Sequence, residues 1–302
     1  MSSTIISENS INKKEVFPSA PLYYIETLWF QVAGTICNLW CEHCLVSANP
    51  TNNNHQMMSL EEVKQHLLEA EKLGVKEFYF TGGEPFMNRD MLAILTETLK
   101  IGPANVLTNG TFLNEALAQK LKVLSDSSHY ALELRISLDG TTKETNDPIR
   151  GEGTFERILK GIQNLAHAGL NPVITVTEAS PELSKEGKKG REKFFELMQS
   201  LGLKQPRMKI LSLFHIGEEE SRSCGYKKNE TLQGLHLSED ELLKLQCTSS
   251  RIVTHEGVWV CPILINDPLA RMGNTITESL VSFELDRGAC YTCHAFGVTC
   301  RT

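Results

Sequence analysis

The sequence has no run of 18 apolar residues, and no apolar stretch near its first residue resembles a secretory signal. We therefore expect a cytoplasmic protein with no membrane partner. It also has no basic excess: 30 lysines and arginines stand against 37 aspartates and glutamates, giving a net charge of −7. Without a basic patch, nucleic acid is not an expected partner. Internal repeats and low-complexity tracts are absent as well.

Cysteine, by contrast, is abundant, with nine residues in 302. In a reducing compartment, clustered cysteines favour metal binding over disulfides. Cys37, Cys41 and Cys44 have the spacing C-x3-C-x2-C and follow an apolar run, Leu28–Gly34, that reads as a strand. A loop leaving a strand can wrap three thiolates around one inorganic centre, and three ligands leave one iron of a 4Fe–4S cluster open. The alternative is a zinc site with His43 as fourth ligand, which its adjacency to Cys44 would strain.

Strand and helix signals alternate along the chain from residue 28. Ser59 and Glu62 form a predicted capping box at the start of a helix that stops at Gly74. Short links between strands and helices imply a parallel sheet with helices on its outer face. Six units, where a closed barrel has eight, predict an α/β fold with an open, TIM-like partial (β/α)6 barrel. The predicted strands are Leu28–Gly34, Lys76–Thr81, Ala104–Leu107, Ala131–Leu138, Pro172–Thr177 and Met208–Phe214, and the helices after the first are Met91–Leu99, Asn114–Leu124, Phe155–Ala168 and Arg191–Leu201.

The C-terminal part is predicted to be a small cysteine-rich domain. A capping box at Ser238 and Glu241 opens a short helix, and a hairpin turns at Glu256-Gly257. A further helix is expected around Thr277–Phe283. The predicted division is an N-terminal arm at 1–22, the barrel at 23–216, a linker at 217–237 and the small domain at 238–302. Cys224, alone in the linker, reads as a bystander thiol.

The order of short motifs after successive strands resembles the radical S-adenosylmethionine (radical SAM) superfamily. The resemblance covers residues 28 to about 215, and the fold it implies agrees with the six-unit count. Its motifs, after C-x3-C-x2-C, are Gly82-Gly83-Glu84-Pro85, Thr108-Asn109-Gly110-Thr111, Ser137-Leu138-Asp139-Gly140 and Arg150-Gly151-Glu152-Gly153-Thr154-Phe155. The C-terminal cysteines resemble the auxiliary-cluster region called SPASM, or its shorter form, twitch.

The resemblance implies that Cys37, Cys41 and Cys44 hold a catalytic 4Fe–4S cluster. The open iron would bind the amino and carboxylate groups of S-adenosylmethionine, and an electron from the cluster would release a 5′-deoxyadenosyl radical. An external electron donor such as flavodoxin or ferredoxin would supply that electron. The protein itself would orient the reactants and exclude water.

Further residues are implied as cofactor contacts. The glycines allow close approach of backbone to ligand, and an arginine fork suits a carboxylate. In the resemblance, the contacts are Gly82 and Gly83, Glu84 at the ammonium, Ser137 and Arg150 at the carboxylate, Asp139 and Asn109 at the cavity, and His43 near the adenine. Each has an alternative: a plain turn for the glycines and for Asn109, a surface ion pair for Arg150 and a solvated loop residue for His43.

A second, auxiliary 4Fe–4S cluster is implied at the C-terminal end. The spacing of the five cysteines is C-x13-C-x28-C-x2-C-x6-C, and two of them flank the predicted hairpin. The expected ligands are Cys247, Cys261, Cys290 and Cys293, with Cys300 able to replace either of the last two. Structural zinc is the alternative. A second auxiliary cluster is not expected, because the printed sequence ends before further cysteines.

The leading hypothesis is an enzyme that abstracts hydrogen from a small molecule, in a dehydrogenation or rearrangement assisted by the auxiliary cluster. A peptide-modifying maturase is one alternative, although the short N-terminal arm offers no room for a peptide-docking module. A non-catalytic iron–sulfur or zinc protein is the other. Glu178 and His215, past the fifth and sixth strands, are either acid/base groups at the cavity mouth or solvated loop residues.

Overall fold

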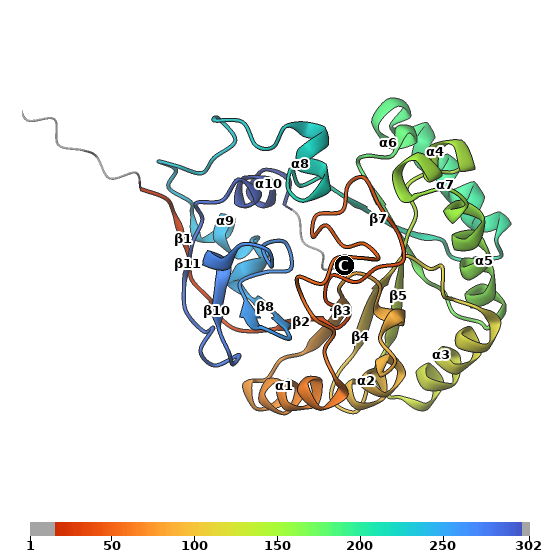
Figure 1. Ribbon diagram of the computed structural model, residues 1–302, viewed down its shortest axis with the longest axis horizontal. Helices are drawn as coiled ribbons and strands as arrows, with labels where there is room; N and C mark the ends of the chain where they lie inside the picture. The colour runs from red at the N-terminus through yellow and green to blue at the C-terminus, as the bar shows by residue number, and fades with distance from the viewer. Residues whose placement is uncertain (1–15, 298–302) are drawn as a thin grey trace, which may run out of the picture.

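The computed structural model describes residues 16–297. Within this part of the chain, nine strands form one sheet in the order β10-β9-β8-β2-β3-β4-β5-β6-β7, and β1 pairs with β11 in a second, two-stranded sheet. Figure 1 shows the large sheet curving, with helices along its outer side. The strands are β1 (Ser19–Ala20), β2 (Thr27–Gln31), β3 (Glu77–Thr81), β4 (Ala104–Thr108), β5 (Leu132–Ser137), β6 (Val173–Thr177), β7 (Arg207–Leu211), β8 (Ser250–Thr254), β9 (Gly257–Trp259), β10 (Arg271–Gly273) and β11 (Phe283–Glu284).

The helices fill most of the links between these strands. Ser59 caps the first helix through the predicted capping box with Glu62, and Gly74 ends it in the left-handed conformation, at φ 77°. The helices are α1 (Leu60–Leu73), α2 (Met91–Thr98), α3 (Glu115–Ser127), α4 (Lys143–Arg150), α5 (Thr154–His167), α6 (Pro181–Glu186), α7 (Lys188–Ser200), α8 (Glu218–Ser223), α9 (Glu239–Leu243) and α10 (Gly288–Phe296), with short 3-10 turns at Pro85–Met87, Gln246–Thr248 and Pro268–Ala270.

The predicted partial (β/α)6 barrel is confirmed. Strands β2 to β7 are all parallel and lie in chain order. Successive side chains of a strand face opposite sides of the sheet. In β2, Leu28 and Phe30 pack into the core beneath the helices, while Trp29 packs into a second core on the inner side. The carboxyl ends of six parallel strands therefore meet around one opening.

The C-terminal region continues this sheet. β8 pairs parallel to β2, and the predicted hairpin is confirmed by the antiparallel pairing of β8 with β9. β10 then extends the sheet by pairing antiparallel to β9. The proposed boundary at residues 217–237 is thus crossed by a continuous sheet. Ser19–Ala20, within the predicted arm, pairs with β11.

One local prediction is wrong. The segment Thr277–Phe283 is not helical: Ile276 and Ser279 form a turn, and Arg251 donates to the backbone carbonyls of Ser279 and Val281. The segment that carries Cys290 and Cys293 forms a nine-residue helix, α10. It is fastened to the rest of the fold by a hydrogen bond between the Tyr226 and Thr292 hydroxyls, 2.7 Å apart. Among the described residues, no helix is long and apolar enough to cross a membrane.

Candidate functional site

A cavity opens at the carboxyl ends of the parallel strands and encloses about 1290 Å³, including space open to solvent. The three cysteines of the C-x3-C-x2-C motif all line it. The structure brings most other predicted cofactor contacts to the same cavity. These are His43, Gly82, Gly83, Asn109, Ser137 and Arg150, whereas Glu84 and Asp139 lie behind the wall.

The loop after β2 that carries the three cysteines is held by contacts on both flanks. Cys37 N–H donates to the Asn49 carbonyl over 3.2 Å, and Glu42 N–H donates to the Ile149 carbonyl over 2.9 Å. Two groups donate to sulfur: Asn109 Nδ2 lies 3.7 Å from Cys37 Sγ, and Ala48 N lies 3.2 Å from Cys44 Sγ. Polar donors therefore face two of the three sulfurs.

Burial raises the pKa of the Cys37 thiol to about 11 and that of Cys41 to about 12. Burial also raises the pKa of Cys44. Thiols of this kind are neutral at physiological pH without a metal, and metal or cluster binding displaces their protons. Three thiols on one loop, with donors at two sulfurs, fit a 4Fe–4S cluster that keeps one iron open.

Gly82 and Gly83 are required by the packing of the cysteine loop. Gly83 N–H donates to the Gly34 carbonyl over 2.9 Å. A Cβ on Gly83 would lie 1.8 Å from the Ile36 carbonyl oxygen, and Gly82 has φ +136°. The glycines therefore let the end of β3 lie directly against the backbone that leads into Cys37, which a plain turn would not need.

Glu84 is fully buried, and its carboxylate accepts hydrogen bonds from other groups of the protein. It accepts from Thr108 Oγ1 over 2.7 Å, from Asn109 N over 2.8 Å and from Phe86 N over 3.1 Å. Burial raises the pKa of Glu84 to about 7 against the effect of these donors. The side chain ties the end of β3 to the end of β4 and does not line the cavity.

Asn109 is more than a turn residue. Besides facing Cys37, its Nδ2 donates to Asn38 Oδ1 over 2.9 Å, and its Oδ1 accepts from Thr111 Oγ1 over 2.6 Å. Asn38 Nδ2 in turn donates to Thr111 Oγ1. The motif after β4 is thus joined to the cysteine loop by hydrogen bonds of the Asn38 and Asn109 side chains.

Asp139 organises the opposite wall. Its Oδ2 lies 2.6 Å from both Arg150 Nη2 and His43 Nε2, and its Oδ1 accepts from Thr177 N and Oγ1, each over 2.8 Å. Although burial opposes ionisation, the charges of Arg150 and His43 hold the pKa of Asp139 well below its usual range. Arg150 is not a surface residue: it is 5% exposed, and its Nε has no hydrogen-bond partner.

Two lining residues escaped the sequence reasoning. Trp29 of β2 and Thr175 of β6 line the cavity, and their polar atoms Nε1 and Oγ1 are buried without a partner. Nothing in the sequence marks them, because only the strand register shows that they face inward. Glu178 is exposed, and His215 stacks on Tyr226 with ring centres 5.3 Å apart. Neither lines the cavity, which is closed instead by 211–214, Pro262 and Ile263.

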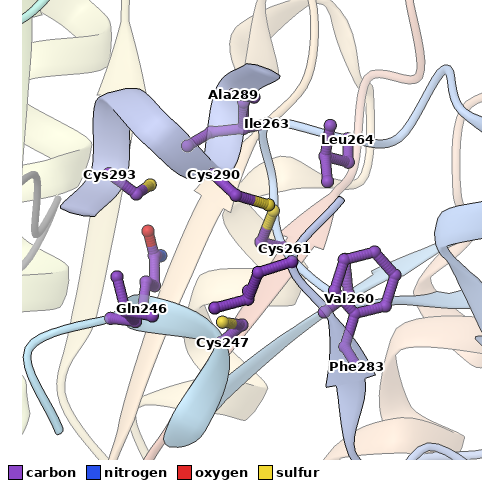
Figure 2. A pocket seen from close by; sticks show the side chains of 12 residues that line it. Gln246, Cys247, Val260, Cys261, Ile263, Leu264, Phe283, Ala289, Cys290 and Cys293 are labelled. Atoms are coloured by element: carbon purple, nitrogen blue, oxygen red, sulfur yellow. The ribbon is translucent and has the colours of Figure 1, made fainter. Parts of the chain in front are cut away.

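The predicted auxiliary cysteines converge on a second, apolar pocket. Figure 2 shows Cys247, Cys261, Cys290 and Cys293 around it, together with Gln246. Cys247 lies in the 3-10 turn before β8, Cys261 follows β9, and α10 carries the other two. Cys300 lies outside the described residues. Cys224 is exposed at the end of α8.

The four thiols of this pocket suit iron–sulfur chemistry. Burial raises the pKa of Cys247 to about 12 and that of Cys290 still further. Among residues 16–297, no three histidine, cysteine or acidic side chains are grouped as a site for a single metal ion. Four cysteines around an apolar pocket are a donor set typical of a 4Fe–4S cluster. Ile263 lines both this pocket and the barrel cavity, so the two sites adjoin at this residue.

Beside the pocket lies Arg251, which is fully buried. Its guanidinium donates to four backbone carbonyls, those of Cys247, Ser250, Ser279 and Val281, over 2.7 to 3.0 Å. Burial lowers the pKa of Arg251 to about 10, so it stays protonated at neutral pH.

The sequence of this chain matches a known protein family and several curated proteins. The model of the Radical SAM superfamily matches residues 32–186, just over half of the chain. A "Probable GTP 3',8-cyclase" of Saccharolobus solfataricus is 28% identical over 182 residues, 60% of this chain and 55% of that protein. An "Fe-coproporphyrin III synthase" of Methanosarcina barkeri is 30% identical over 183 residues, 60% of this chain and 42% of that protein. The chain thus spans about half the length of these curated relatives.

Solved structures share the fold. SuiB of Streptococcus suis, bound to the precursor peptide SuiA, superposes with a TM-score of 0.61 at 14% identity over 83% of this chain and 62% of that one. The structure of anSMEcpe with bound AdoMet gives a TM-score of 0.59 at 17% identity over 84% and 77% of the two chains. Both superpositions extend beyond the segment that the family model covers.

Proposed function

This chain belongs to the radical SAM superfamily, and from that premise we propose that it abstracts hydrogen from a small molecule in a dehydrogenation or rearrangement assisted by a second, auxiliary 4Fe–4S cluster. The observation that carries the proposal is the adjacency of two cysteine-lined pockets that share Ile263. One pocket has three cysteines and a large open volume, as a site for catalysis requires. The other has four cysteines and is lined by apolar side chains.

In this proposal Cys37, Cys41 and Cys44 hold the catalytic cluster. When bound, the cluster and S-adenosylmethionine supply a 5′-deoxyadenosyl radical for hydrogen abstraction. Arg150 Nε, buried without a partner in the cavity wall, donates to the carboxylate of S-adenosylmethionine, and Ser137 adds a hydroxyl nearby. The Asp139 carboxylate holds the Arg150 guanidinium in place and also contacts His43. The Gly82–Gly83 backbone presents its polar groups to the ammonium, while Glu84 holds that turn rigid.

The substrate is proposed to lie deeper in the barrel, against Trp29 and Thr175. A buried polar atom without a partner is costly in the free protein, so a ligand that satisfies it gains affinity. Indole N–H can only donate, and a threonine hydroxyl can donate or accept. A small molecule with carbonyl, ether or hydroxyl oxygens would satisfy both groups.

The auxiliary cluster is proposed to accept an electron and not to bind the substrate. Cys247, Cys261, Cys290 and Cys293 are enough to ligate every iron corner, which leaves no open position for a substrate atom. Because Ile263 lines both pockets, the auxiliary cluster would lie next to the barrel cavity. That role suits an oxidation in which the substrate radical loses one further electron.

Radical SAM enzymes need a reductant, and we propose an external flavodoxin or ferredoxin. The names of the two relatives reported above, a GTP cyclase and a synthase of Fe-coproporphyrin III, support a small-molecule substrate. "Mycofactocin maturase MftC" of Mycolicibacterium smegmatis is 32% identical over 134 residues, 44% of this chain. This match to a maturase keeps the maturase hypothesis as the second candidate.

The test is iron and sulfide analysis of anaerobically reconstituted protein, alongside a variant with Cys37, Cys41 and Cys44 all changed to alanine. We expect about eight irons in the parent and about four in the variant, because each 4Fe–4S cluster contributes four. After dithionite reduction, only the parent should release 5′-deoxyadenosine from S-adenosylmethionine. About four irons in the parent and none in the variant would exclude the auxiliary cluster. A fully loaded parent that releases no 5′-deoxyadenosine would contradict the catalytic assignment.

A further inference from the structure

The pocket of four cysteines has a polar side chain that nothing in the protein satisfies. Gln246 is 3% exposed, and both its Nε2 and its Oε1 are buried without a hydrogen-bond partner. It lines the pocket, and Figure 2 shows its amide end pointing into the space among Cys247, Cys290 and Cys293. A buried amide with no partner is costly, and its orientation into the pocket indicates that the bound group completes it.

Arg251 supplies a second unusual feature at the same place. It is 0% exposed, and the acceptors that hold its guanidinium are the carbonyls of Cys247, Ser250, Ser279 and Val281. No carboxylate is among these partners. A buried cation is stable only when a negative charge compensates it. Nη1 donates to the carbonyl of Cys247 itself, over 2.7 Å, so the charge lies beside one of the proposed ligands.

We propose that Arg251 and Gln246 form the polar lining of the auxiliary site, and that they raise the reduction potential of the cluster held there. The proposal rests on the proposed auxiliary cluster and adds the residues that set its electron affinity. Four thiolates around a 4Fe–4S core carry net negative charge in either oxidation state. Such a cluster would supply the negative charge that the neutral hydrogen-bond partners of Arg251 do not provide.

The sign follows from electrostatics. Reduction adds one negative charge to the site, so a nearby cation stabilises the reduced state more than the oxidised state. Hydrogen bonds to cluster sulfurs act in the same direction, and the potential of an iron–sulfur cluster depends on both. Cysteine and sulfide sulfurs offer only acceptors, so Gln246 must present Nε2 to them. Both residues therefore favour a site that takes up electrons.

The test uses the full chain with Cys37, Cys41 and Cys44 changed to alanine, so that only the auxiliary site can carry a cluster. Its midpoint potential is measured by redox titration followed by electron paramagnetic resonance. Arg251→Gln should lower the one-electron equilibrium constant for reduction at least tenfold, which corresponds to about 59 mV. Arg251→Lys, which keeps the charge, should recover most of the shift. Gln246→Leu should lower the constant severalfold, and Gln246→Glu, which replaces the donor by a carboxylate, should lower it further.

Two controls separate a local effect from a general one. Arg222→Gln removes an arginine of α8 that pairs with Glu219, and Gln233→Leu changes an exposed glutamine; neither should move the potential. If the Arg251 variants lose their iron, the potentials of the two Gln246 variants test the proposal instead. If Gln246 and Arg251 variants that carry the cluster have the same reduction potential as their parent, this inference is overturned, while the proposed auxiliary cluster still stands. A triple-alanine background without a cluster would overturn the auxiliary site and this inference together.

Discussion

Arg150 and Asp139 form an ion pair of 2.6 Å that is almost wholly shielded from water behind the wall of the barrel cavity. The pair joins α4 to the end of β5, and His43 of the cysteine loop contacts the same carboxylate oxygen. Because Asp139 holds Nη2, the Arg150 fork is fixed before any ligand arrives, and Nε remains unpartnered. The carboxylate is therefore a positioning group for the arginine and for the loop.

Asp139→Asn tests this arrangement. Removing one partner leaves the Arg150 charge buried and uncompensated, which typically costs about 3–5 kcal/mol of folding free energy. We also expect weaker binding of S-adenosylmethionine by the reconstituted protein. Urea unfolding and equilibrium binding measure the two effects. The matched control is Asp126→Asn, which breaks an exposed pair with Lys122 and should cost about 0–1 kcal/mol. Equal small losses in both variants would contradict the buried pair.

Gly83→Ala should prevent the N-terminal cluster from assembling. The added Cβ would lie 1.8 Å from the Ile36 carbonyl oxygen, so the backbone leading to Cys37 must move. We expect iron content to fall by about half, since the C-terminal pocket is untouched. Gly234→Ala is the control, because a Cβ there meets nothing within 4 Å and only the positive φ of 74° is strained. It should cost stability, by about 1 kcal/mol, without loss of iron. Full iron content in Gly83→Ala would disprove the steric argument.

Glu84 should make the stability of the metal-free protein depend on pH. Burial raises its pKa from 4.5 to about 7. The folded state therefore holds a proton that the unfolded state has released between these values, so stability present below about pH 4.5 is lost as pH rises through about 7. The slope attributable to one such proton reaches about 1.4 kcal/mol per pH unit. Urea unfolding from pH 5 to 7 should show a flatter profile for Glu84→Gln than for the parent. Glu115→Gln, at an exposed position, should leave the parent slope unchanged.

The convergence of the barrel motifs could be predicted because it follows from chain direction alone. Parallel strands end at one edge, so residues just past Thr81, Thr108 and Ser137 must meet. The partners within that edge could not be predicted. Asp139 meets Arg150 only because α4 intervenes, and that short helix contains Pro148, which argues against a helix in sequence.

The structure of the C-terminal region was harder to predict from sequence for a similar reason. In α10 the sequence Gly288–Phe296 contains glycine, threonine and two cysteines, which are weak helix formers, so packing and not propensity forms this helix. Four cysteines could be predicted to share a pocket. The orientation of Gln246 and the hydrogen bonds of Arg251 to backbone carbonyls depend on tertiary contacts, some between segments about 30 residues apart, which no local pattern reports.

Thr175→Val distinguishes a substrate-binding hydroxyl from a structural one. The Thr175 hydroxyl is buried without a hydrogen-bond partner, so replacing it with a methyl group of similar size removes an unsatisfied polar atom. We expect the free energy of unfolding of the substrate-free protein to rise by about 1 kcal/mol, while turnover falls. Thr98 is the matched control, since it is also buried but donates to the Ile94 carbonyl over 2.9 Å. Thr98→Val loses that hydrogen bond and should be destabilised by about 1 kcal/mol. Opposite signs in the two variants, measured by denaturant unfolding, would mark Thr175 as a group held ready for a ligand. A loss of stability in both would show that the Thr175 hydroxyl serves the fold and would remove it from the proposed substrate site.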